Sequence, residues 1–280
     1  MTARLPLVTY DRPPLIEVVI GVQFERLARL DAARLGLLWE RFRSRFPKTD
    51  QKPALDPSIE RLGLRGPLGA TRLELLSEFR QRLWFLNEAE DELVQVQDDR
   101  FIRNWRQGSA HDRAYPRFEE LLPRFFEDFA VFRAFLDAEQ VGTVAANQCE
   151  VTYVNLIKSN DHWSSHGQLA NIFQGWSPEY SQRVEWPLES VQFNVAHLIN
   201  DDKGEFVGRL HVSMEPVFAT AQGSPATPVP AFRLTLTARG RPLSEGFDGI
   251  SSFLELGHRA VVTSFDKMAS GDMQRAWGRV

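Results

Sequence analysis

The sequence contains a single cysteine, Cys149, among its 280 residues. It therefore cannot form an intramolecular disulfide or a cysteine-rich zinc site. It also lacks any run of about eighteen apolar residues, which excludes a membrane-spanning helix. Prolines and an aspartate interrupt residues 1–15, where a signal peptide would need a continuous apolar stretch. We therefore expect a cytoplasmic protein that makes no membrane contact.

The common catalytic motifs are missing as well. No Gly-x-Gly-x-x-Gly run opens a helix after a strand, and there is neither a Gly-Lys-Ser/Thr phosphate loop nor a Gly-x-Ser-x-Gly elbow. Cys149 is predicted to lie on an apolar strand face, where a thiol is inert. The formal net charge of −4 argues against a surface devoted to nucleic acid, although it permits a local basic patch. The sequence thus favours a protein with no catalytic residues, metal or cofactor.

The composition is that of an ordinary globular protein, with 43% hydrophobic and 25% charged residues. In the first half, the apolar pattern predicts helices after Asp31 and after Tyr115, and strands at 15–24, 71–78, 82–86 and 92–106. Residues 48–69 are predicted to form a loop with at most a short strand. In the second half, the apolar pattern predicts helices at 166–174 and 244–268, and strands at 147–158, 190–200, 205–218 and 231–239.

The same order of elements therefore occurs twice, at an offset of about 130 residues. We expect an α+β fold made of two similar β-α-β-β-β-α units, residues 1–140 and residues 141–280. Each unit should form an antiparallel sheet with helices packed on one face. The alternative is that this order recurs by chance, because the two halves share few identical residues.

Most predicted strands carry one apolar and one polar face, because side chains alternate along a strand. The polar positions include Gln, Asn, His and Arg, which make directed hydrogen bonds, whereas solvated sheet faces are usually rich in Lys, Glu and Thr. The polar positions are Gln23, Gln95, Gln97, Asp99, Gln148, Glu150, Thr152, Gln192, Asn194, Arg209, His211, Ser213, Arg233, Thr235, Thr237 and Arg239. This polar face is either a solvated outer surface or a surface that binds a partner.

Residues 95–106 form the most distinctive stretch, in which arginines are interleaved with aromatic residues. Arg100, Arg103, Trp105 and Arg106 could bind phosphates and stack a base. The alternative is that Trp105 belongs to the core and that the arginines pair with nearby acidic residues. Nucleic-acid binding is therefore a second hypothesis.

Two further pairs of residues have spacings that suggest chemistry. His162 and His166 are four residues apart, as a helical metal pair would be, but no third ligand stands at a matching spacing. Glu17 and Glu150 occupy matching positions in the two units. A desolvated carboxylate can act as an acid or base, and an enzyme using either glutamate is a third hypothesis. Either glutamate could equally bind an arginine at the sheet.

Four motifs together resemble a sporadically distributed, uncharacterised bacterial protein family of about this length. The resemblance runs through most of the chain, and its motifs are Pro13–Phe24, Gln95–Arg106, Tyr115–Phe118 and Cys149–Asn155. It implies no activity and assigns no catalytic residues. A patchy distribution implies genes that move between hosts, which favours a role in defence or in a toxin–antitoxin pair.

Taken together, these observations predict a non-enzymatic interaction protein that presents the polar face to a protein partner. Nucleic acid is an alternative ligand, and the exposed face would also suit a homodimer. The predicted binding residues are Gln95, Gln97, Arg103, Trp105, Arg106, Gln192, Asn194, Arg209, His211 and Arg233.

Overall fold

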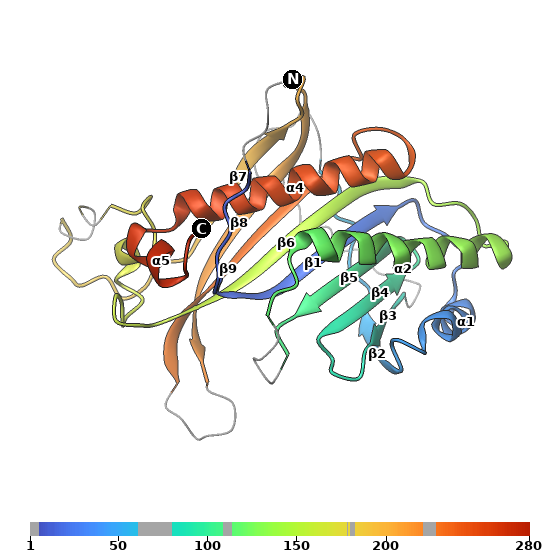
Figure 1. Cartoon of the computed structure of the whole chain (residues 1–280), viewed down its shortest axis with the longest axis horizontal. Helices are drawn as coiled ribbons and strands as arrows, with labels where there is room; N and C mark the ends of the chain where they lie inside the picture. Colours follow the sequence, from blue (N-terminus) through green and yellow to red (C-terminus); the bar gives the residue numbers. More distant parts are fainter. Residues whose placement is uncertain (1–5, 61–79, 109–113, 178, 180–182, 221–227) are drawn as a thin grey trace.

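The computed structural model of the chain describes residues 6–60, 80–108, 114–177, 179, 183–220 and 228–280. Its described strands form one nine-stranded sheet in the order β2-β3-β4-β5-β1-β6-β9-β8-β7, and all pairs are antiparallel. The two long helices, α2 and α4, lie side by side over one face of this sheet (Figure 1). No described helix is long and apolar enough to cross a membrane.

The first half of the chain supplies one arm of the sheet and the helices α1 and α2. Its elements are β1 (Leu15–Phe24), α1 (Ala32–Phe42), β2 (Lys48–Pro53), β3 (Gln81–Leu86), β4 (Glu92–Gln97), β5 (Arg100–Arg106) and α2 (Phe118–Ala138). The carboxylate of Asp31 accepts a hydrogen bond from the backbone N–H of Arg34 and so caps α1, as predicted.

The second half supplies the other arm. Its elements are β6 (Ala146–Lys158), the 3-10 turn η1 (Leu169–Asn171), β7 (Phe193–Asn200), β8 (Phe206–Ala219), β9 (Val229–Gly240), α4 (Gly246–Met268) and α5 (Gly271–Ala276). Gly240 lets α4 approach the sheet closely, because a Cβ atom there would lie 2.4 Å from the ring of Phe253.

The two arms meet at the centre of the sheet, where β1 pairs with β6. Outward from β1 the order is β5, β4, β3, β2, and outward from β6 it is β9, β8, β7. The chain therefore has the predicted mixture of helices with antiparallel strands, but the strands make one continuous sheet. The internal repeat and the division at residue 140 stay predictions.

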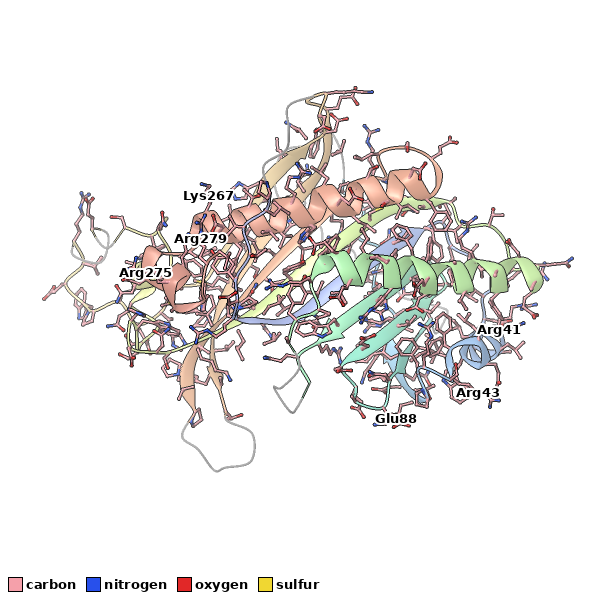
Figure 2. All side chains as sticks on the ribbon, viewed as in Figure 1. Arg41, Arg43, Glu88, Lys267, Arg275 and Arg279 are labelled. Carbon is pink, nitrogen blue, oxygen red and sulfur yellow. The ribbon has the colours of Figure 1, made fainter. Side chains whose placement is uncertain are left out.

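The apolar face of the sheet and the two long helices enclose the core. Val18, Ile20, Val22 and Phe24 are buried on this face, as their alternation predicted. The aromatic stripe of α2 packs over them, and the ring of Phe132 stacks on Phe101 with centroids 5.2 Å apart. At the outer rim, Figure 2 shows the exposed side chains of α1 and of the β3–β4 hairpin pointing away from the sheet, among them Arg41, Arg43 and Glu88.

Three expectations about local structure were wrong or fall outside the described chain. Residues 92–106 are two strands, because the chain turns at Asp98–Asp99 and β4 pairs with β5 as a hairpin. The predicted helix at 166–174 is only the short 3-10 turn η1. The predicted strand at 71–78 lies outside the described residues. β2 is the short strand that the prediction allowed within residues 48–69.

Candidate functional site

Residues 54–60 lie across the polar face of the sheet and cover its middle. This segment, which we call the strap, contacts side chains from six neighbouring strands, β4 to β8 in sheet order. It begins at Leu55 over Gln97 of β4 and ends at Glu60 over Arg209 of β8. Below it, a cavity of about 280 Å³ opens toward Gly21 and Ile102.

Three glutamine side chains hold the backbone of the strap. Gln97 makes two hydrogen bonds with Leu55: its Oε1 accepts from the backbone N–H at 2.9 Å, and its Nε2 donates to the carbonyl at 3.0 Å. Gln23 Oε1 accepts from the N–H of Ser58, and Gln148 Oε1 accepts from that of Glu60, both at 3.0 Å. These glutamines bond only to main-chain atoms of the strap, so they hold its backbone without contacting its side chains through hydrogen bonds.

The end of the strap is fixed by a cluster of charges around Glu60. Its carboxylate accepts from Arg209 at 2.7 Å and from Nε2 of His211 at 2.6 Å, and Arg239 lies 3.8 Å away. Burial raises the pKa of Glu60, but the hydrogen bonds from His211 and Arg209 outweigh it, so the net pKa lies below its ordinary value. The charged carboxylate is therefore the form that holds the strap in place.

The strap changes the interpretation of the polar face. Gln97, Arg209 and His211 were predicted as binding residues, and the structure brings all three onto the strap. Gln95 is also buried, and it bonds to Arg82 and Asn104. The predicted binding residues did not include Gln23, Gln148 or Glu60, although the strand alternation placed the two glutamines on the polar face. The directed-bonding residues on the strands were a usable signal, but nothing in the sequence indicates which segment they would meet.

The arginine–tryptophan stretch does not form one surface. Successive residues of β5 point to opposite sides of the sheet, so Arg103 and Trp105 lie under the helices and Arg106 lies on the polar face. Arg103 and Trp105 are each only 4% exposed. Arg103 is bonded to Asp128 of α2, which Arg45 also contacts. The structure thus removes Arg103 and Trp105 from the set of accessible binding residues.

Arg106 and the two glutamates form ion pairs. Arg106 Nε donates to Glu17 at 2.9 Å, and its guanidinium lies over the ring of Trp84. Arg239 donates to Glu150 at 2.7 Å. Each glutamate thus binds an arginine, which is the structural role considered for them. Within the described residues, no group of three or more His, Cys, Asp or Glu side chains is arranged to hold a metal ion.

The far end of the polar face, beyond the strap, is accessible. Gln192 and Asn194 are exposed, and Arg233 forms an exposed ion pair with Glu215. β7 is the last strand of the sheet, and among the described residues no strand pairs with its outer edge. Val195 and Leu198, on opposite sides of β7, are both exposed. Within the described part of the chain, this end of the sheet therefore offers an unpaired strand edge as well as exposed side chains.

The other edge of the sheet is protected in a way that β7 is not. β2 carries Lys48, Asp50, Lys52 and Pro53, and such residues discourage a further strand from pairing. β7 reads Phe-Asn-Val-Ala-His-Leu-Ile-Asn, with no Lys, Arg, Asp, Glu or Pro. A long, uncharged, partly apolar edge is a template for another strand. We call the outer edge and exposed side chains of Phe193–Asn200 the β7 edge.

Comparison with known proteins adds no family to this description: no protein-family model matches the chain, and no curated protein matches it.

Proposed function

We propose that this protein is a non-enzymatic interaction protein and that it binds a protein partner at the β7 edge. The partner contributes an extended strand that pairs with the free backbone N–H and C=O groups of β7. The observation that carries the proposal is the contrast between the two sheet edges, since only β2 has the charges and proline that prevent such pairing.

The side chains around the edge support a protein partner. On the strap side of the sheet, Asn194 and Leu198 are exposed, and on the helix side Val195 and His197 are exposed. An added strand would cover apolar and polar groups on both faces at once, as in strand addition generally. We therefore place the partner at the β7 edge and not at the middle of the polar face, which the strap already covers.

The biological setting is part of the same proposal. The resemblance to a sporadically distributed bacterial family supports a component of a defence or toxin–antitoxin system that acts in the cytoplasm.

The test is to purify tagged protein from its native host and identify any protein that comes with it in stoichiometric amount. Leu198→Lys puts a charge on the β7 edge, and we expect the partner to be lost. Leu37→Lys on α1 is the matched control, because both leucines are 52% exposed. It should retain the partner.

Light scattering on the same samples identifies the kind of partner. A wild-type mass of two chains that falls to one chain in Leu198→Lys would make the partner a second copy. A partner retained equally by wild type and Leu198→Lys would refute binding at the β7 edge. A wild-type chain that is monomeric and carries no stoichiometric protein would refute it too.

A further inference from the structure

A second cavity lies on the helix side of the sheet, far from the strap. Its volume is about 330 Å³. It is bounded by the N-terminal stretch Pro6–Tyr10, the beginning of α2 and the middle of α4. Most of its lining is apolar, from Leu15, Leu236, Val261, Val262 and Phe265. A concave, mainly apolar site of this size with a few polar groups is typical of a small-molecule site.

Three polar side chains of this cavity form a chain of hydrogen bonds, and Thr9, Tyr10, Arg117, Glu119 and Asn155 also line it. The hydroxyl of Tyr115 lies 2.7 Å from the hydroxyl of Tyr153, which lies 2.9 Å from Nδ1 of His258. The imidazole of His258 stacks on Phe118 at 4.0 Å with the planes 5° apart. All four side chains line the cavity, so this chain of bonds ends at its surface.

The imidazole is uncharged at neutral pH. Burial lowers the pKa of His258 from 6.5 to about 4, and the positive charge of Arg259 acts in the same direction, against an opposing effect of Glu119. Burial also raises the pKa of both tyrosines. The whole chain of bonds is therefore neutral, and a ligand in contact with it would be held by hydrogen bonding and apolar contact.

One hydrogen-bonding position of Tyr115 is left over. If Nδ1 of His258 accepts from Tyr153, then Tyr115 donates to Tyr153 and its oxygen can still accept. If Nδ1 carries the proton, both hydroxyls reverse and Tyr115 has a hydrogen to donate. A ligand hydroxyl satisfies either arrangement, because it can both donate and accept. A carbonyl, which only accepts, or an ammonium group, which only donates, would match only one of them.

The volume of the cavity limits the size of the ligand that it can hold. An apolar cavity of about 150 Å³ is large enough to bind benzene. The cavity here, at about 330 Å³, is about twice that size and would hold two fused rings or an equivalent branched skeleton. The surrounding side chains make burial of such a skeleton favourable, at about 25 cal/mol for each Å² removed from water.

We infer that this cavity binds a small, uncharged, apolar molecule of about bicyclic size that carries one hydroxyl group, with the hydroxyl bonded to Tyr115. The site does not depend on the proposed partner binding at the β7 edge, because it lies on α2, α4 and the N-terminal stretch. It would make this protein a binder of phenols or alcohols as well as of a protein.

Titration calorimetry with 2-naphthol and with naphthalene tests the assignment. We expect wild type to bind both and to prefer 2-naphthol. Tyr115→Phe should weaken 2-naphthol binding about 3- to 10-fold, the contribution of one hydrogen bond, and should leave naphthalene binding unchanged. Tyr10→Phe is the matched control: Tyr10 also lines the cavity, but its hydroxyl is bonded to Asp266, so the preference for 2-naphthol should persist.

A second variant tests the cavity itself. Val262→Phe places a larger side chain into the space, and both compounds should lose at least about 10-fold in affinity. Circular dichroism on each variant establishes that it is folded. Failure of wild type to bind 2-naphthol overturns the inference. A preference for 2-naphthol that survives Tyr115→Phe, or binding that survives Val262→Phe, overturns it as well.

Discussion

Lowering the pH from about 7.5 to about 5 should destabilise this protein through His258. The side chain is buried against Phe118 and Tyr153, and burial holds its pKa at about 4 in the folded state, compared with 6.5 for an unperturbed histidine. Between these two values the unfolded chain binds a proton at His258 and the folded chain does not. Stability therefore rises with pH in this range and is lost as the pH falls through 6.5.

The size of the effect follows from the two pKa values. Each pH unit between them changes the free energy of unfolding by about 1.4 kcal/mol for one group. Close to its own pKa the group is only partly titrated, so the loss between about pH 7.5 and about pH 5 amounts to about 2 kcal/mol. The lowered pKa values of Glu60 and Asp266 affect stability only at still lower pH.

Urea unfolding followed by tryptophan fluorescence at the two pH values measures this loss. His258→Asn is the comparison, because an amide can replace Nδ1 as the partner of Tyr153 without titrating. Wild type should lose about 2 kcal/mol more than the variant on acidification. If both lose the same free energy of unfolding, the burial of His258 does not control its protonation and the reasoning fails.

Two further variants test the ion pairs. Asp128→Ala leaves two arginines without their buried carboxylate, so urea unfolding should show that the free energy of unfolding falls by about 3–5 kcal/mol. The control is Asp137→Ala at an exposed position of the same helix, which should lower it by less than about 0.5 kcal/mol. Equal losses in the two variants would contradict this. Glu60→Gln removes the charge that anchors the strap and should lower the free energy of unfolding by about 2 kcal/mol. Glu215→Gln, in an exposed ion pair, should lower it by under about 1 kcal/mol. If Glu60→Gln left the free energy of unfolding unchanged, the strap would not be held by charge.

Much of the local structure could be read from the sequence. The strand 15–24 and the helices after Asp31 and after Tyr115 were all predicted, because apolar periodicity and helix caps act over a few residues. Alternation along the strands also gave the correct faces for Gln97 and Arg209. The turn at Asp98–Asp99 was missed because apolar and aromatic residues continue on both sides of it.

The sites depended on contacts that no local pattern records. Glu60 meets Arg209 and His211 across about 150 positions of sequence, and Tyr115 meets Tyr153 and His258 from three separate elements. The sequence by itself determined most of the elements, the faces of the strands and the absence of familiar catalytic motifs. Only the tertiary structure decided that the strap covers the polar face and that, among the described residues, no strand pairs with the outer edge of β7, because strand order and loop path are set by packing between distant segments.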